Sequence, residues 1–159
     1  MERRTTSPTY SAALRFLSRK GYSKLSLISK LQSKGFDSSE IDKAIIKLEE
    51  LNYIREDFYK RSRIIKLMRQ CYSVHSIQMQ LEEQDNIQST TSEILTIFSE
   101  FKITEEDLIK KIINKKCSLE KKSSDDEVKI KNKVLRSLHS KGHTEEAYAF
   151  FVDEELQVT

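Results

Sequence analysis

The sequence predicts an all-α protein built from three tandem three-helix repeats, which form an elongated, curved array. Three observations predict this fold class. Only 3 Gly and 1 Pro occur among 159 residues, so the turn residues that β-rich folds need are scarce. Apolar residues recur along most of the chain at spacings of three and four, the period of an amphipathic helix. A ten-residue word also occurs twice, first from Leu31 and again from Leu138.

Each copy of the repeated word ends one helix at a glycine and begins another behind a capping residue. Gly35 and Gly142 stop the first helix of each pair. Asp37 and Thr144 precede the second helix. A weaker third copy lies between these two. Repetition of this kind predicts an array of helical modules, which acts by surface contact more often than by catalysis.

The predicted repeats cover residues 11–55, 56–103 and 104–159, after an N-terminal tail of residues 1–10. A polar stretch at residues 118–126 is expected to be a connecting loop inside the third repeat. Each repeat is expected to have a small core of its own, with bending possible from one repeat to the next.

In the first repeat, one helix ends at Gly21 and a second ends at Gly35. The third helix is expected to begin with a capping box, in which Asp37 and Glu40 satisfy the first free backbone N–H groups. An apolar stripe then marks the face of this helix that should be buried. The stripe consists of Ile41, Ala44, Ile45, Leu48 and Leu51.

In the second repeat, one helix starts near Glu56 and reaches Cys71, a second follows Ser73, and a third begins at Thr91. The third repeat opens with a helix at Thr104, and its last two helices follow the polar loop and the second copy of the repeated word. The apolar stripes of these six helices are Tyr59, Ile64, Leu67 and Met68; Ile77 and Leu81; Ile94, Ile97, Phe98 and Phe101; Leu108, Ile109, Ile112 and Ile113; Val128, Ile130, Val134, Leu135 and Leu138; and Ala147, Tyr148, Phe151 and Val152.

The net charge of +3 conceals four blocks of alternating sign. Residues 1–70 carry a net charge of +8, residues 71–109 carry −7, residues 110–141 carry +7 and residues 142–159 carry −5. Segregation on this scale favours a surface that faces both an anion and a partly basic protein. For any single block, simple solvation of a helix face is the alternative.

Several classes of function are disfavoured by the sequence. It contains no phosphate-binding loop, nucleophile elbow or recurring pair of carboxylates, so we do not expect an enzyme. No apolar stretch approaches the ~20 residues of a membrane span, and the start has no apolar signal core. The two cysteines, Cys71 and Cys117, form no framework and are expected to be small buried apolar residues of a cytoplasmic protein.

Two pairs of possible metal ligands stand four residues apart, and neither is expected to bind a metal. His139 and His143 have the spacing of half a zinc helix, but Gly142 breaks the helix between them. Cys71 and His75 have the same spacing, and a site that combined all four side chains would require two repeats to fold together. We therefore expect no metal and no cofactor.

The motifs of this sequence resemble those of the RecX family of recombinase regulators, which is built from tandem three-helix repeats. In that family the second helix of a repeat ends in Leu-x-x-x-Gly-aromatic, as Leu31 to Phe36 does here. The family joins its repeats through a leucine, Gly-Tyr-Leu, acidic residues and Phe or Tyr. This chain reads Leu51-Asn52-Tyr53-Ile54-Arg55-Glu56-Asp57-Phe58-Tyr59 at that junction. Leu138 and Gly142 supply the pattern again in the third repeat.

The resemblance covers roughly residues 11–155, and the central repeat is the divergent one. Asn52 stands where the family has Gly, although Asn also tolerates a left-handed turn. Ser73-Val74 replaces an expected Gly-Pro, and Gln84-Asp85-Asn86-Ile87 replaces an expected Lys-Gly-Ile. The order of the motifs across three repeats is their specific part.

The resemblance implies a non-enzymatic protein that binds the RecA recombinase and its filament on single-stranded DNA. Such a protein would lie along the helical groove of the filament and restrain ATP hydrolysis and strand exchange, in DNA recombination, repair and the SOS response. The partners expected are RecA, its filament and single-stranded DNA, with at most weak binding to duplex DNA. We expect a monomer.

Basic residues on three predicted helices are candidates for contact with DNA or the filament. Several are neighbours at helical spacing, such as Arg15 with Arg19, and like charges so placed slightly destabilise an isolated helix. A phosphate chain or an acidic groove would relieve this repulsion. The candidates are Arg15, Arg19, Lys20, Lys24, Lys30, Lys34, Arg61, Arg63, Lys66 and Arg69.

Four tyrosines near these cations, namely Tyr10, Tyr22, Tyr59 and Tyr72, are candidates for stacking on bases, as in single-strand binders. The alternative is that Tyr59 belongs to the core and that the lysines are merely solvated. A second functional hypothesis is a stand-alone helical nucleic-acid-binding module with helix-turn-helix geometry. A third is a repeat scaffold that binds neither partner.

Reversal of Arg61, Arg63 and Arg69 to Glu should weaken binding to the filament or to DNA and flatten the dependence of binding on salt, because fewer counterions are released. Fluorescence anisotropy of a labelled strand across a salt titration measures both effects. Binding that is unchanged across the titration would show that these three positions do not contact the anion.

Overall fold

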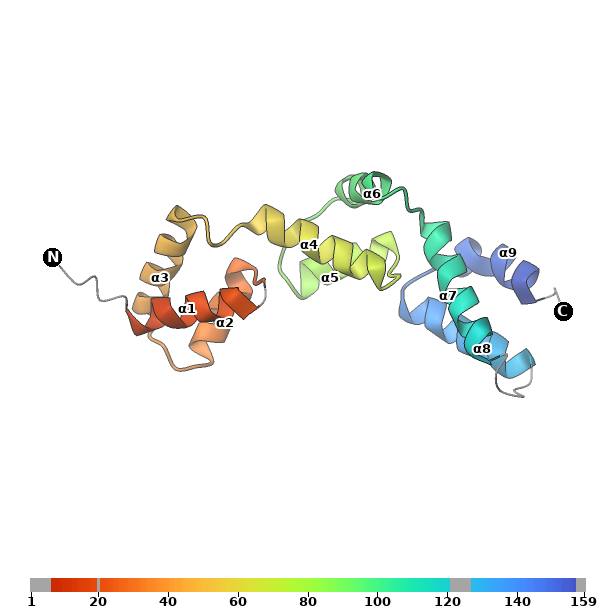
Figure 1. Ribbon diagram of the computed structural model, residues 1–159, viewed down its shortest axis with the longest axis horizontal. Coiled ribbons are helices and arrows are strands. Elements are labelled where there is room, and N and C mark those ends of the chain that lie inside the picture. The colour runs from red at the N-terminus through yellow and green to blue at the C-terminus, as the bar shows by residue number, and fades with distance from the viewer. Residues whose placement is uncertain (1–6, 20, 121–126, 157–159) are drawn as a thin grey trace. The chain divides into compact units, whose positions relative to one another are not determined.

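The computed structural model describes residues 7–19, 21–120 and 127–156, and within them the chain forms nine α-helices and no β-strand (Figure 1). This confirms the all-α class that the scarcity of Gly and Pro predicted. The elongated, curved form expected for the array stays a prediction. In chain order the helices are α1 (Pro8–Arg19), α2 (Lys24–Gln32), α3 (Ser38–Glu50), α4 (Glu56–Arg69), α5 (Val74–Glu83), α6 (Thr91–Glu100), α7 (Glu105–Glu120), α8 (Glu127–Ser140) and α9 (Glu145–Leu156).

Two of the expected boundaries were wrong. Helix α1 begins at Pro8, so residues 8–10 belong to the first bundle rather than to a tail, and Tyr10 is only 7% exposed. Helix α7 continues to Glu120, so residues 118–120 are helical rather than part of a polar loop. The rest of that loop, residues 121–126, and residues 1–6 of the tail lie outside the described residues.

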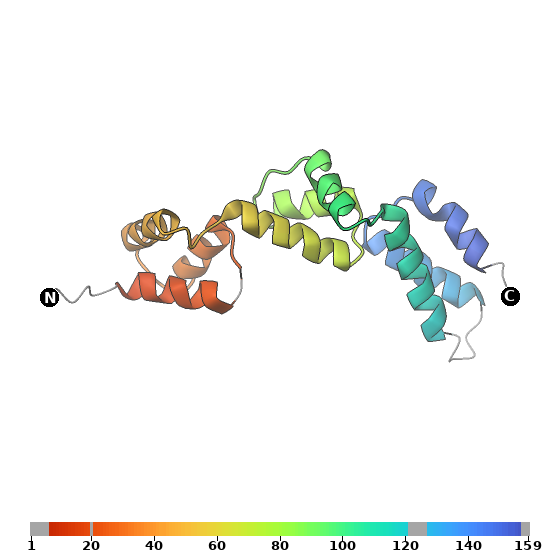
Figure 2. The same cartoon turned by 45° about the horizontal axis from the view of Figure 1, so that its top comes forward.

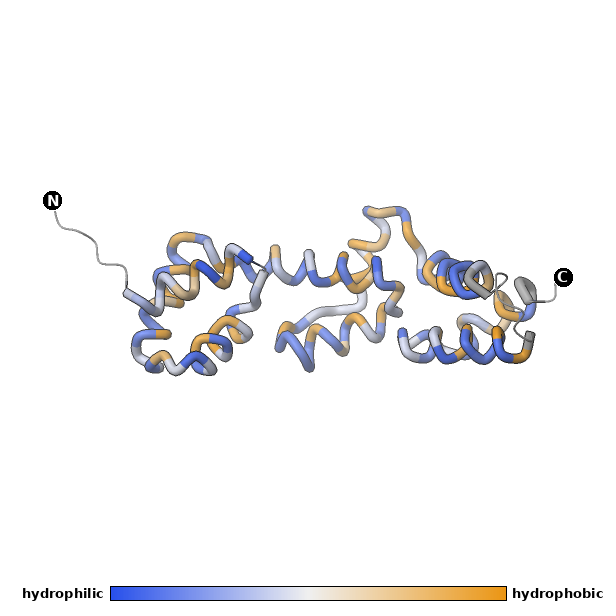
Figure 3. The backbone as a smooth tube through the Cα atoms, turned by 60° about the horizontal axis from the view of Figure 1, so that its bottom comes forward, coloured by the Kyte–Doolittle hydropathy of each residue, from blue (hydrophilic) through white to orange (hydrophobic). Residues whose placement is uncertain are grey.

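The chain divides into two compact units, of which the first comprises residues up to 62 together with residues 84–87. Helices α1, α2 and α3 contact one another in this unit and enclose a core that includes Ala13, Leu27 and Leu48. Full burial of each such leucine stabilises the fold by about 1.5–3 kcal/mol relative to exposure. Hydrophobic residues recur among hydrophilic ones along each helix, as the stripes predicted (Figure 3).

The capping box expected at the start of α3 forms only in part. The Asp37 carboxylate caps the helix by accepting a hydrogen bond from the Ser39 backbone N–H at 2.9 Å. The Glu40 carboxylate instead accepts the Thr9 hydroxyl of α1 at 2.7 Å. Glu40 therefore joins two helices of the first unit, because Thr9 is buried beside it and needs an acceptor.

The second unit comprises residues 63–83 and 88 onward, and its helices share one hydrophobic core that runs from Ile64 to Val152. Helices α7, α8 and α9 contact one another and lie side by side in both ribbon views (Figures 1 and 2). The expectation of a separate small core for each of the last two repeats was therefore wrong. The division into three repeats remains our proposal for the organisation of the sequence.

The same type of turn ends many of the helices. A residue two or three positions after the end of the helix adopts a positive φ, and the next backbone N–H reaches back five residues to a carbonyl of the last turn. Phe36 N–H thus bonds to Leu31 O at 3.4 Å, and His143 N–H bonds to Leu138 O at 3.1 Å. The two copies of the repeated word are therefore copies of one turn. The positive-φ residues are Gly35, Asn52, Cys71, Asn86, Lys102 and Gly142.

Asn52 has φ 55°, which confirms that it takes the left-handed conformation expected where the RecX pattern has Gly.

None of the helices in the described part of the chain combines the length and the apolar character that crossing a bilayer requires.

The two repeated glycines differ in the space around them, and this difference is testable. Both have positive φ, so Gly35→Ala should cost about 1–2 kcal/mol through backbone strain alone. A Cβ at Gly142 would also meet Ser76 Oγ at 1.8 Å and Ser76 Cβ at 2.9 Å, whereas a Cβ at Gly35 meets nothing within 4 Å. Gly142→Ala should therefore cost about 1–3 kcal/mol more than Gly35→Ala.

The loss of stability is measured by amide hydrogen exchange of the buried helices in the unit that carries each substitution. Gly35→Ala is the matched control for strain without crowding. Equal losses of protection in the two variants would mean that Ser76 moves aside at no cost.

Candidate functional site

The candidate cations on α1 and α2 lie on the surface of the first unit. Arg15 and Arg19 are exposed on α1, and Lys34 is exposed in the turn after α2, whereas Lys30 is half-buried. Lys24 Nζ lies 2.7 Å from Glu49 Oε1, with 41% and 39% of the two side chains exposed. A surface ion pair of this kind contributes at most about 1 kcal/mol. Lys20 lies outside the described residues.

The candidates on α4 fall into both units. Arg61 is exposed in the first unit and Arg63 is half-buried in the second, and both side chains interact with other parts of the chain. Lys66 and Arg69 are exposed in the second unit. The described candidates therefore divide between the two units: Arg15, Arg19, Lys24, Lys30, Lys34 and Arg61 lie in the first, and Arg63, Lys66 and Arg69 lie in the second.

The tyrosines differ in their availability for stacking. Tyr10 is buried, and Lys47 Nζ lies 4.7 Å from the centroid of its ring. Tyr59 is half-buried and donates its hydroxyl to Asp85 Oδ1 at 2.7 Å, which favours its reading as a structural residue. Tyr72 lies at the edge of a hollow in the second unit.

This hollow is lined mainly by charged and polar side chains. It is open to solvent, has a volume of about 570 Å³, and lies in the second unit at the ends of α4 and α8 and along α7. Five cations line it and no carboxylate does, so we call it the basic hollow. Its cations are Arg69, Lys111, Lys115, Lys116 and Lys141.

Local helix geometry explains how α7 contributes to the basic hollow. Lys111 and Lys115 are one helical turn apart and therefore lie on the same face. The neighbouring residues Ile109, Ile112 and Ile113 are buried in the shared core and hold the helix in place. The strongly basic block at residues 110–141 signalled these lysines, but the sequence did not single them out as site residues. A solvated helix face would carry the same pattern.

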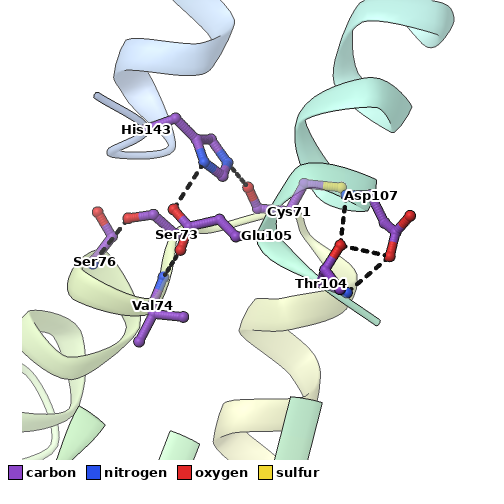
Figure 4. A network of polar contacts seen from close by, with 8 residues as sticks. All are labelled: Cys71, Ser73, Val74, Ser76, Thr104, Glu105, Asp107 and His143. Atoms are coloured by element: carbon purple, nitrogen blue, oxygen red, sulfur yellow. Dashed lines mark hydrogen bonds and ion pairs between the residues drawn. The ribbon is translucent and has the colours of Figure 1, made fainter. Parts of the chain in front are cut away.

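Two turns far apart in the sequence are hydrogen-bonded together beside the basic hollow, and Figure 4 shows the contact between His143 and Cys71. The Ser73 backbone N–H donates to the Lys141 carbonyl at 2.9 Å. His143 Nε2 lies 2.9 Å from the Cys71 carbonyl oxygen, and because a carbonyl can only accept, Nε2 is the donor. We call these contacts the turn lock. They fix the backbone on both sides of Tyr72 and next to Lys141.

Glu105, at the start of α7, completes the turn lock. Its Oε1 lies 3.2 Å from His143 Nδ1, and its Oε2 accepts the Val74 backbone N–H at 3.4 Å (Figure 4). The His143 side chain is completely buried, whereas that of Glu105 is 35% exposed. The hydrogen bond to His143 lowers the pKa of Glu105 below its ordinary value, against the opposing effect of burial. The Val74 N–H and the charge of His143 act in the same direction.

His139 and His143, which were considered together as a pair of metal ligands, have separate roles. His143 belongs to the turn lock, and exposed His139 lies 2.8 Å from the Tyr148 hydroxyl through Nε2. Within residues 7–19, 21–120 and 127–156, no group of three or more His, Cys, Asp or Glu side chains is arranged to hold a metal ion. Cys71 is buried and Cys117 is partly buried, and no disulfide joins them.

Comparison with known proteins identifies the family. The model of "RecX, first three-helix domain" matches residues 10–48. The protein named Regulatory protein RecX from Clostridium botulinum is 30% identical over 132 residues, which cover 83% of this chain and 61% of that protein. Its namesake from Syntrophotalea carbinolica is 41% identical over 59 residues, which cover 37% of this chain and 39% of that protein. The chain belongs to the RecX family. It thus spans less than two thirds of the length of either relative.

Solved RecX structures share the fold. The crystal structure of RecX from Lactobacillus salivarius superposes with a TM-score of 0.63 at 22% identity, covering 95% of this chain and 96% of that one. Another crystal structure of regulatory protein RecX gives a TM-score of 0.65 at 21% identity, covering 91% of this chain and 71% of the other. At this level of identity the likeness concerns the fold alone.

The turn lock of this RecX protein should make the second unit sensitive to acid. The pKa of Glu105 in the folded state lies below its ordinary value of 4.5. Its contribution to stability is therefore fully present well above pH 4.5 and is lost as the pH falls through the folded-state value. Glu105→Gln should destabilise the second unit at pH 7 and should reduce the further loss between pH 5 and pH 3.

Urea unfolding at a series of pH values measures this change, with Glu106→Gln as the control because Glu106 is an exposed neighbour on the same helix turn. If both variants lost stability with the same pH profile as the original chain, the carboxylate of Glu105 would not be the group responsible.

Proposed function

We propose that this chain is a non-enzymatic regulator of the RecA recombinase. It binds RecA and the RecA filament on single-stranded DNA and inhibits ATP hydrolysis, strand exchange and recombination. The observation that carries this proposal is membership in the RecX family, whose relatives are named regulatory proteins. The RecX-type repeat junction from Leu51 to Tyr59 supports the same assignment at the level of the sequence.

The charge distribution suits such a partner. A filament of protein on DNA presents phosphates, and exposed Lys and Arg side chains bind phosphates with little regard to base sequence. In the first unit, Arg15, Arg19 and Lys34 are exposed and suited to this contact. In the second unit, the basic hollow gathers Arg69 with four lysines. The ten cations named from the sequence remain candidates for the contact.

We further propose that the protein works in the cytoplasm as a monomer. Cys71 and Cys117 form no disulfide, which suits a reducing compartment. Light scattering of the purified protein tests the monomeric state directly, and a mass of twice 18.6 kDa would contradict it.

Addition of this protein to RecA on single-stranded DNA should slow ATP hydrolysis, because ATP hydrolysis by RecA depends on the filament to which the protein binds. The slowing should occur with fewer copies of the protein than of RecA, since one copy that spans several subunits affects all of them. A coupled assay of ADP release measures the rate, and the same assay without DNA is the control for the background.

An unchanged ATPase rate with the protein in excess over RecA would contradict the proposal. Selective binding to one duplex sequence in the absence of RecA would support the helix-turn-helix alternative instead.

A further inference from the structure

The cations of the basic hollow are not neutralised by neighbouring carboxylates. Five positive side chains face one open space, and no Asp or Glu lines it. Within the described residues, none of the five forms an ion pair with a carboxylate. The folded protein therefore retains the mutual repulsion of these charges, and a bound polyanion would relieve it.

The hollow is also partly preorganised. Lys141 Nζ lies 3.8 Å from the centroid of the Tyr72 ring, so a cation–π contact holds this ammonium group at the edge of the hollow. The turn lock fixes the backbone of both residues, through the Lys141 carbonyl and through the carbonyl of Cys71 next to Tyr72. A ligand therefore meets these two side chains without having to order the turns that carry them.

We propose that the basic hollow binds the sugar-phosphate backbone of single-stranded DNA. Four of its five cations are lysines, which act as flexible point charges and suit a row of phosphates better than a single anion of fixed geometry. Lys111 and Lys115 are separated by about 6 Å along the axis of α7, and Arg69 and Lys141 line the same hollow. Several cations around one open space can therefore contact more than one phosphate of a strand.

An acidic protein segment is the competing ligand, and the lining of the hollow disfavours it. A helix or strand that docks in a groove is held mainly by apolar anchors. Here the main apolar contributions come from Cys71, Tyr72 and Ile112, of which Cys71 and Ile112 are buried in the core. The half-buried ring of Tyr72 lies beside several lysines, and an aromatic ring next to lysines is instead a common feature of proteins that bind single strands.

This inference rests on the proposed function, because that function is what identifies the ligand as single-stranded DNA. Its test uses the full chain with Lys111→Glu and Lys115→Glu combined. The control combines Lys43→Glu with Lys129→Glu, which makes the same change in net charge at exposed positions on α3 and α8 outside the hollow. Circular dichroism first verifies that both variants keep their helices.

The measurement is the anisotropy of a fluorescent oligothymidylate across a salt titration. Reversal of both hollow lysines should weaken binding about tenfold or more relative to the control. It should also reduce the slope of log K against log salt by about 1.4, which is 0.7 for each phosphate contact on a single strand. Lys111→Arg combined with Lys115→Arg should restore binding, because the charge is kept.

Equal affinities and slopes in the hollow and control variants would overturn the inference. So would a fluorescent polyglutamate peptide that bound the original chain more tightly than the oligonucleotide and lost that binding in the hollow variant. The RecA ATPase assay separates the two proposals. If RecA is slowed while oligonucleotide binding does not depend on the hollow, only this inference fails. If oligonucleotide binding depends on the hollow and RecA is unaffected, only the proposed function fails.

Discussion

The second unit depends on how its buried polar groups at the turn lock are satisfied. His143 is completely buried, yet Nε2 donates to the Cys71 carbonyl and Nδ1 faces the Glu105 carboxylate. A buried polar group without a partner would cost about 1–3 kcal/mol, so each contact depends on the position of the others. Three segments meet here, namely the turn after α4, the start of α7 and the turn after α8. Their arrangement places Tyr72 and Lys141 beside the basic hollow and makes one core out of helices from two sequence repeats.

The repeated turn is a local motif that acquires different roles in different surroundings. Gly35 and Gly142 have nearly the same φ, and the following residue makes the same backbone hydrogen bond in each case. Around Gly35 there is open space, so the turn only ends a helix. Around Gly142 the side chains of Ser73 and Ser76 leave no room for a Cβ, so this turn is also a packing contact. Close approach of the two backbones there allows the Lys141 carbonyl to accept the Ser73 N–H.

This packing turns the segregated charges of the sequence into one concave basic surface. The block at residues 110–141 is strongly basic in sequence, but a basic helix alone has no concave site. Contacts among α7, α8 and α9, together with the shared core, place the lysines of α7 in one hollow with Arg69 and Lys141. The resulting hollow has a surface potential that no single helix has, because several charges act on the same open space.

The sequence by itself determined the helices, most of their ends, and the family. Apolar spacing, capping residues and left-handed residues such as Gly35 and Asn52 act over a few residues, so they can be read without knowledge of the rest of the fold. Only the tertiary structure decided that Glu40 binds Thr9, that the last two repeats share a core, and that Lys111 joins Arg69 in one hollow. These pairings join residues tens of positions apart. They depend on which surfaces fit together and satisfy each other's hydrogen bonds, and no local pattern of residue types encodes that choice.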